Sequence, residues 1–369
     1  MSTTILLNLE QYKTQAKDLL KAAKLGEAQS LARVSTYFPA KAAEHQSLKL
    51  ADAQLTIARE NNFPSWPKFQ QYILFQNAVH LLDTGDLSNL DLLLTKYKFV
   101  LSYRCHVGEW YDSGYFAGAN LLNHIAGNPI RVPLPTNILE VTKLLLSHGA
   151  AKDISRTKYT IGLLLSSRQA SEAFVALPLI DLLDQHCSLG TDLLSTETLH
   201  MPLTQSSPDT VQELIKRGAK IDIYSAAHLG MFELVEKLAP SSTPAEIDKA
   251  CLGASWKNHP GIVEYLIDRG ADPNADGGTG FGALHTAVHS GYLSCVRALL
   301  KNKPNLEVIN RFGSTSLGLA IYSAINEPQP DHLAIIKELV LAGADVNPSW
   351  YETTSTDINS LLQRLKPKT

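Results

Sequence analysis

Leucine-rich helical turns recur along the chain, and most of them end in a glycine. They are KLLLSHGAAKD, ELIKRGAKID, EYLIDRGADPN, RALLKNKPNLE and ELVLAGADVN, at residues 143–153, 213–222, 264–274, 297–307 and 338–347. Apolar residues three and four positions apart give each predicted helix one apolar stripe. Gly149, Gly218, Gly270 and Gly343 stand where a helix end needs a left-handed residue. The pattern predicts a series of short helices that pack side by side.

The spacing of these endings predicts a repeated unit of two short helices and a turn. From Gly270 to the corresponding Lys303 there are 33 residues, and from Lys303 to Gly343 there are 40. About eight such units fit between residues 77 and 347, several of them degenerate. Because each unit buries its apolar face only against its neighbours, we expect an all-α solenoid of stacked helix-turn-helix repeats.

The segment GFGALHTAVHSGYLSCVRALLKNKPNLE, residues 280–307, resembles an ankyrin repeat. In that family a TPLHxAA motif begins the first helix, and here Gly282 and Ala283 replace its Thr-Pro. The resemblance implies an ankyrin-type solenoid. It also implies that His285 is the structural histidine of the repeat, buried and hydrogen-bonded to the backbone. Ala287 is small enough for the inner helices of adjacent repeats to approach closely.

The N-terminal part has a different pattern. Its stretch LADAQLTIARENNFPSWPKFQQYI is similar to the helical segment that precedes the repeats in a family of bacterial ankyrin-repeat proteins. That resemblance implies no reaction, because the family has no assigned chemistry. A solenoid must cover its terminal repeats with elements whose outer face is polar. We therefore expect a helical cap over residues 1–76, repeats over 77–347 and a capping segment over 348–369.

Composition and charge exclude several classes of partner. The formal net charge of −3 provides no basic field for a nucleic acid. No stretch of about 18 apolar residues occurs, so no membrane span is expected. The four cysteines, Cys105, Cys187, Cys251 and Cys295, are scattered without a CxxC pair, which is typical of reduced thiols. We expect a cytoplasmic monomer.

Two short motifs invite a metal interpretation. His285 and His289 lie four positions apart on one predicted helix, but Thr286 stands where a zinc protease needs its general-base glutamate. The stretch DPNADG, residues 272–277, matches half of a calcium loop, yet Ala283 stands where the bidentate glutamate belongs. We therefore interpret both motifs as structural and expect neither a metal nor a cofactor.

A row of ring-bearing residues is the best candidate binding surface. When the small inner-helix alanines are aligned, the position two residues later carries His228, Trp256, His289 and Tyr322. Large aromatic side chains dominate binding hot spots. Lys257 and the hairpin residues Phe281, Arg311 and Phe312 are predicted beside them. Our leading hypothesis is a non-enzymatic scaffold that binds a partner protein in its concave groove, with a slight preference for an acidic segment.

A second hypothesis concerns the aromatic-rich insertion SYRCHVGEWYDSGYFAG, residues 102–118. A loop longer than a plain hairpin is often functional. This hypothesis assigns small-ligand binding, or catalysis, to a pocket with His106, Glu109, Trp110, Tyr111 and Tyr115. Within it, His106 and Glu109 are the candidates for proton transfer. A third hypothesis, a purely structural element of a larger assembly, has no distinguishing residue in the sequence.

Overall fold

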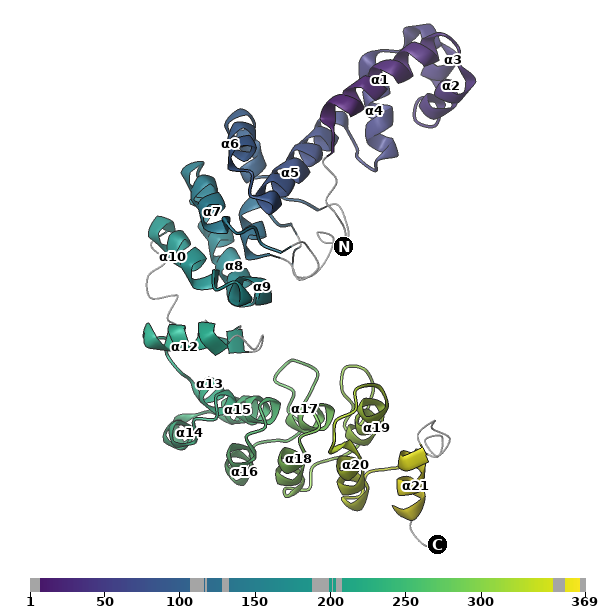
Figure 1. The fold of residues 1–369 in the computed structure, drawn as a ribbon. Coiled ribbons are helices and arrows are strands. Elements are labelled where there is room, and N and C mark those ends of the chain that lie inside the picture. The colour runs from purple at the N-terminus through teal and green to yellow at the C-terminus, as the bar shows by residue number, and fades with distance from the viewer. Residues whose placement is uncertain are drawn as a thin grey trace. The chain divides into compact units, whose positions relative to one another are not determined.

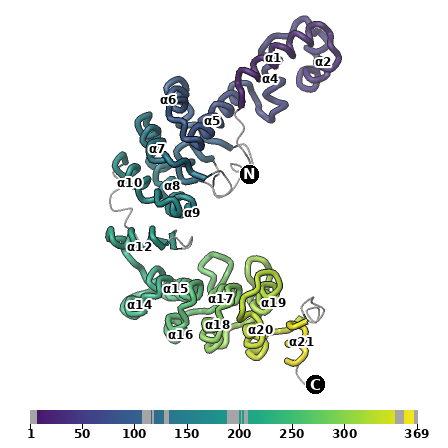
Figure 2. The backbone as a smooth tube through the Cα atoms, viewed as in Figure 1, coloured from purple at the N-terminus to yellow at the C-terminus, as the bar shows by residue number. Residues whose placement is uncertain are grey.

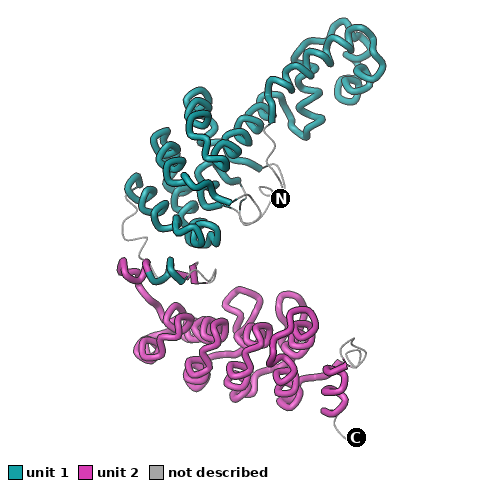
Figure 3. Tube along the Cα trace, viewed as in Figure 1, with its two compact units in different colours: residues 1–193, 204–212 teal, residues 194–203, 213–369 magenta. Residues whose placement is uncertain are grey.

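The computed structural model describes residues 7–106, 116, 118–127, 133–187, 199–200, 202–203, 208–347 and 356–365. All regular elements in these ranges are helices, which confirms the predicted all-α class (Figures 1 and 2). The chain divides into two compact units (Figure 3). Unit 1 contains residues 1–193 and 204–212, and unit 2 contains residues 194–203 and 213–369.

Unit 1 begins with a group of helices: α1 (Leu9–Lys24), α2 (Ala28–Ser35), α3 (Pro39–Ala43), η1 (His45–Ser47), α4 (Leu50–Glu60) and α5 (Trp66–Thr84). The side chain of Asn8 accepts the N–H of Gln11 and so caps the start of α1, which packs against α4. Helix α5 contacts α1 and α4 and also the elements that follow. It runs without a break through position 76, where we expected the cap to end.

The rest of unit 1 consists of α6 (Leu87–Lys96), η2 (Lys98–Leu101), η4 (Leu121–Ala126), α7 (Ile138–Ser147), η5 (Ala150–Lys152), α8 (Ile154–Leu165), α9 (Arg168–Glu172) and α10 (Ala176–Cys187). Helices α5 and α6 form a helix pair at the expected start of the repeats, although α5 begins before residue 77, at Trp66. Contacts join α5, η4 and α8 in one row and α6, α7 and α10 in another. Unit 1 therefore stacks helical segments in the two rows expected of a solenoid.

One inner element of unit 1 differs from the expected α-helix. Residues 121–126 form the 3-10 helix η4, and all six are buried. The Asn120 side chain accepts the N–H of Asn123 at 3.1 Å, and the Asn123 side chain accepts the N–H of Asn120 at 2.9 Å. At the other end Gly127 adopts a φ of 71°. The Asn120–Asn123 hydrogen bonds and the left-handed Gly127 lie only a few residues apart, so the helix between them is short. 3-10 geometry is common in helices of this length.

Unit 2 contains a regular series of helix pairs. Its elements are α13 (Ile223–His228), α14 (Phe232–Leu238), η7 (Ala239–Ser241), α15 (Pro244–Trp256), α16 (Pro260–Asp268), α17 (Ala283–His289), α18 (Leu293–Leu300), α19 (Ser316–Asn326), α20 (His332–Leu341) and α21 (Thr356–Leu365). Helix α12 (Pro208–Lys216) contains the boundary between the units. Helices α13, α15, α17 and α19 form the inner row, and α14, α16, α18 and α20 form the outer row (Figure 1).

Helix α21 covers the end of this series. It packs against α20 and buries Ile358 and Leu362. It lies within the segment 348–369, whose assignment as a cap stays a prediction.

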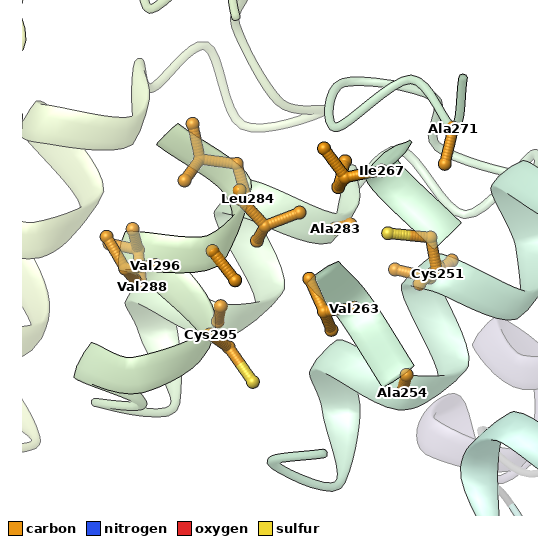
Figure 4. Packing of buried hydrophobic residues seen from close by; sticks show 14 of the residues in the cluster. Cys251, Ala254, Val263, Ile267, Ala271, Ala283, Leu284, Val288, Cys295 and Val296 are labelled. Atoms are coloured by element: carbon orange, nitrogen blue, oxygen red, sulfur yellow. The ribbon is translucent and has the colours of Figure 1, made fainter. Parts of the chain in front are cut away.

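Small apolar side chains form the core between the two rows. Figure 4 shows Ala254, Ala283 and Val288 of the inner helices near Val263 and Val296 of the outer ones. The four aligned alanines, Ala226, Ala254, Ala287 and Ala320, are fully buried. Burial also raises the pKa of the Cys251 and Cys295 thiols to about 12. All four cysteines of the chain are free, as expected.

A left-handed residue follows each of the helices α12, α16, α18 and α20. Gly218, Gly270 and Gly343 have φ values of 94°, 92° and 100°. Lys303 occupies the corresponding place with a φ of 48°. A Cβ in the left-handed region costs about 1 to 2 kcal/mol. Lys303 is therefore a strained position within the series.

Two histidines join one pair of helices to the pair before it. The His259 ring lies with Nε2 3.1 Å from the carbonyl oxygen of His228, at the end of α13. Likewise His332 Nε2 lies 3.2 Å from the carbonyl oxygens of Val288 and His289, at the end of α17. The Nδ1 atom of His332 accepts the N–H of Gln329, so its Nε2 carries the proton and donates. Each ring thus bonds to carbonyl oxygens in the last turn of the inner helix of the preceding pair.

We expect Ala287→Leu to lower the free energy of unfolding by about 1 to 3 kcal/mol, because overpacking a tight helix junction has no easy relief. His289→Ala, on the exposed edge of the same helix, should cost less than about 1 kcal/mol. Urea unfolding of both variants measures the ranking. The reverse order would mean that the repeat register along α17 is wrong.

We expect Lys303→Gly to raise the free energy of unfolding by about 0.5 to 1 kcal/mol, because glycine adopts the left-handed backbone without strain. The matched variant is Gly270→Ala. A Cβ there meets no atom within 4 Å, so its expected loss of about 1 kcal/mol comes from the backbone alone. Urea unfolding checks both signs, and a destabilised Lys303→Gly variant would contradict the strain at this position.

Candidate functional site

The ring positions of the inner helices do not all share one environment. Trp256 is 37% exposed and Tyr322 is 56% exposed, and His289 is also exposed. His228 is only 3% exposed, so our expectation that it lies on the accessible edge is wrong. Its ring packs against Tyr224 at 5.8 Å and Trp256 at 6.4 Å between centroids. The exposed ring set therefore comprises Trp256, His289 and Tyr322.

Burial determines the protonation of His228. Neither ring nitrogen makes a hydrogen bond of normal geometry with a described residue, although the backbone of Leu203 lies beside the ring. Burial, followed by the positive charge of Lys257, lowers the pKa of His228 to about 4. The half-buried Lys257 therefore lies close enough to act on this ring. At neutral pH His228 is an uncharged core residue.

His285 and His289 lie on one helix in different surroundings. His285 is buried as the ankyrin resemblance implies, and burial lowers its pKa. The backbone of Ser314 and Val308 lies beside its ring, but the expected hydrogen bond is not formed with normal geometry. His289 instead has Nδ1 3.1 Å from Ser323 Oγ and Nε2 3.8 Å from Glu327. Because Ser323 is fully buried, this grouping presents no accessible nucleophile.

The hairpins carry a cluster of two phenylalanines around one arginine, which we call the tip cluster. The Arg311 guanidinium lies 5.6 Å from the Phe281 ring and 4.9 Å from the Phe312 ring. The two rings meet edge to face at 5.7 Å. The Arg311 N–H also donates to the carbonyl of Gly280 at 2.9 Å, which ties the two hairpins together. Phe312 is nevertheless 69% exposed.

Ile309 lies on the same hairpin as Phe312 and is also exposed. Ile309 was not among the hairpin residues predicted from the repeat register. The signal available in the sequence was an apolar residue, Ile309, two positions before Arg311 in the predicted hairpin. The exposed apolar surface of this hairpin is therefore larger than we predicted.

Two equivalent pockets lie one repeat apart beside the hairpins. The smaller, of about 480 Å³, includes Asn274, Gly280, Gly282 and His285 in its lining. The larger, of about 740 Å³, includes Glu307, Gly313, Thr315 and Gly318, each 33 residues further along the chain. Tyr322 and Asp345 also line the larger pocket.

The larger pocket is acidic, because Glu307 and Asp345 both line it. Glu307 accepts the N–H of Asp345 at 2.9 Å, so the two side chains belong to neighbouring hairpins that meet here. Both residues are exposed. The pattern of apolar and aromatic positions could not reveal this, because the acids come from two repeats and are 38 residues apart.

The outer row is held by ion pairs between successive helices. Arg297 of α18 bonds to Glu338 of α20 at 2.8 Å. Lys301, directly after α18, pairs with Glu264 of α16. These side chains are occupied with one another, unlike the exposed rings of the inner row. Exposed pairs of this kind contribute about 0 to 1 kcal/mol each.

The alternative pocket can be described only in part. Glu109, Trp110, Tyr111 and Tyr115 lie outside the described residues. His106 is exposed, and a Cβ on Gly118 would lie 2.8 Å from its ring. The N–H of Cys105 donates to the carbonyl of Ala119 at 3.0 Å, so the two ends of the insertion are joined. The catalytic roles suggested for this pocket stay a prediction.

The calcium-like loop is organised by its own hydrogen bonds. The Asp276 carboxylate accepts the N–H groups of Gly278 at 2.8 Å and Gly280 at 3.1 Å. Within the described ranges, no three His, Cys, Asp or Glu residues come together in a way that could hold a metal ion. In the same ranges, no helix is long and apolar enough to cross a membrane.

Comparison with known proteins identifies the class of the repeats in unit 2. Residues 250–349 match the family described as ankyrin repeats, in three copies. The chain is also 26% identical, over an alignment of 192 residues, to a protein of Acanthamoeba polyphaga mimivirus that is named as an ankyrin repeat protein. That alignment covers 42% of this chain and 23% of the viral protein. The chain thus spans about a quarter of the length of this relative.

We expect the chain to lose stability as the pH falls from about 6.5 to 4, because His228 resists protonation in the folded state. The unfolded chain, with an ordinary histidine pKa of 6.5, binds more protons in this range than the folded one does. The expected loss is about 1 to 3 kcal/mol. The depressed pKa of His285 adds to it in the same direction.

Urea unfolding at pH 7 and pH 4.5 measures this loss. His228→Leu keeps a buried apolar side chain and removes the titrating ring, so its loss should be smaller than that of the wild type. An equal loss in the two proteins would show that the burial of His228 does not control the pH dependence.

Proposed function

We propose that this protein is a monomeric cytoplasmic scaffold, without enzymatic activity, that binds a partner protein through the inner side of unit 2. Ankyrin repeats are generally protein-interaction modules, and residues 250–349 match that class. The binding surface in this proposal consists of Trp256, His289 and Tyr322 on the inner helices together with the tip cluster. Lys257 lies beside it, whereas His228 supports it from the core.

The difference between the two rows carries this proposal. Two ion pairs join successive segments of the outer row, while Trp256, Tyr322 and Phe312 are exposed on the inner helices and a hairpin. Phe232 of the outer helix α14 is also exposed, but it lies against Tyr265 of α16. Trp and Tyr side chains bury a large area at low entropic cost, and they are enriched in binding hot spots. An exposed apolar hairpin beside them extends the same surface. The inner side therefore has the residue types from which a binding site is built.

The acids beside Tyr322 add a preference for a basic residue at one place in the partner segment. Arg311, which we first associated with an acidic partner, already lies against two aromatic rings. The acids Glu307 and Asp345 line the larger pocket beside Tyr322. A lysine or arginine side chain can meet the acids while its stem lies along the tyrosine. Exposure and salt limit the energy of these charges, so they direct specificity more than affinity.

We expect Trp256→Ala and Tyr322→Ala each to weaken partner binding by about 2 kcal/mol or more, because each removes a large exposed ring. Glu264→Ala and Lys337→Ala, on the outer helices, should cost less than about 0.5 kcal/mol. A partner protein is first captured with the full chain and purified. Titration calorimetry then measures its affinity for the wild type and for all four variants.

Unfolding curves of the same variants provide the control, because a loss of stability would mimic a loss of binding. If the outer-helix variants bind weakly and the ring variants bind normally, the partner docks on the outer row. That result would contradict the proposed surface.

A further inference from the structure

A second candidate site lies in unit 1, outside the part of the chain that matches ankyrin repeats. It is a cavity of about 530 Å³. Its lining comes from η2, the chain after η2, the start of η4, and the turn that joins α7 through η5 to α8. The lining residues are Lys98, Leu101, Ser102, Arg104, Asn120, Ser147, His148, Gly149, Ala150, Lys152 and Asp153. Ser102 and Arg104 belong to the aromatic-rich insertion, but its five proposed pocket residues are not among the lining residues.

The cavity is basic, and its single acid is already occupied. Asp153 accepts the N–H of Arg156 with one carboxylate oxygen and pairs with Arg104 at 3.2 Å through the other. In the described part of the chain, Lys98 and Lys152 form no ion pair. Three basic side chains and one acid therefore leave the lining with two uncompensated positive charges.

The turn between α7 and α8 holds the side chains of Lys152 and His148 close to the cavity wall. A Cβ on Gly149 would lie 2.8 Å from Lys152 Cε and 3.4 Å from its Nζ, so the lysine side chain folds back over this glycine. The His148 ring is held by Asp91 at 2.7 Å and is therefore not an additional free cation. Lys152 thus presents its ammonium group beside the backbone of the turn.

A buried amide adds a neutral donor to the cationic ones. Asn120 is only 5% exposed, and its side-chain oxygen is used by the N–H of Asn123. Its amide NH2 makes no hydrogen bond with the described residues, and it is not among the fully buried polar atoms without a partner. The NH2 group is therefore free to donate at the cavity surface.

We propose that this cavity binds the phosphate monoester of a small organic molecule. A phosphate monoester carries about two negative charges near neutral pH, which balances the two uncompensated cations. Lys98 and Lys152 neutralise the phosphate group, while Arg104 and Asn120 donate hydrogen bonds to its oxygens. Sites for small ligands have volumes of about 300 to 1,000 Å³, so the cavity has room for more than a bare phosphate ion. This site is independent of the groove in unit 2.

Titration calorimetry on the full chain tests this proposal with glycerol 3-phosphate as the probe, glycerol as the uncharged control and inorganic phosphate as the minimal anion. We expect glycerol 3-phosphate to bind, glycerol not to bind, and inorganic phosphate to bind more weakly than the ester. Binding should weaken when salt is raised from about 50 to 500 mM, because the charges lie near the surface.

The double variant Lys98→Gln/Lys152→Gln should weaken binding of the ester at least about tenfold, equivalent to about 1.4 kcal/mol. The matched control is Lys143→Gln, an exposed lysine on α7 that does not line the cavity, and it should leave binding unchanged. Melting curves of the variants check that unit 1 stays folded.

Three results would overturn the proposal. The first is no binding of glycerol 3-phosphate at about 10 mM, a concentration that would reveal even millimolar affinity. The second is equal binding of the ester by the double variant and the wild type. The third is binding of inorganic phosphate as tight as that of the ester. The last result would show that the cavity recognises an ion and not an organic phosphate.

Discussion

The close approach of neighbouring inner helices is the constraint on which the rest of unit 2 depends. Ala226, Ala254, Ala287 and Ala320 stand at the same place in successive helices, and each is fully buried. With a methyl group at this position, the next helix can lie directly against it, and the hairpins then come close enough for Arg311 to meet Phe281. The tip cluster and both groove pockets follow from that spacing.

The two rows of helices show how one repeat can serve both stability and recognition. In the outer row, Arg297 pairs with Glu338 and Lys301 pairs with Glu264, each across successive helices. The inner row is held instead by small apolar contacts beneath its surface. Its exposed positions are consequently free to carry large rings, such as Tyr322, without loss of packing.

The sequence was sufficient to predict the helix pairs of unit 2, because their apolar spacing and terminal glycines are local signals. It failed where burial depends on distant segments. His228 occupies the same register position as Tyr322, but only its own surroundings, with Tyr224 and Trp256 against the ring, bury it. The acidic pocket escaped prediction for a similar reason, since Glu307 and Asp345 come from different repeats. Assignment of the ring positions to a binding surface stays a prediction.

The histidines that begin the outer helices have a consequence for how the repeats come apart. His332 belongs to the pair formed by α19 and α20, yet its ring bonds to the end of α17 in the preceding pair. His259 makes the same kind of bond from the pair of α15 and α16 to the end of α13. Detaching the pair of α19 and α20 therefore removes a donor from the end of α17 as well as its own packing, so the loss of one pair also weakens the pair before it. Helix α21 packs against α20 and so helps to hold this junction closed.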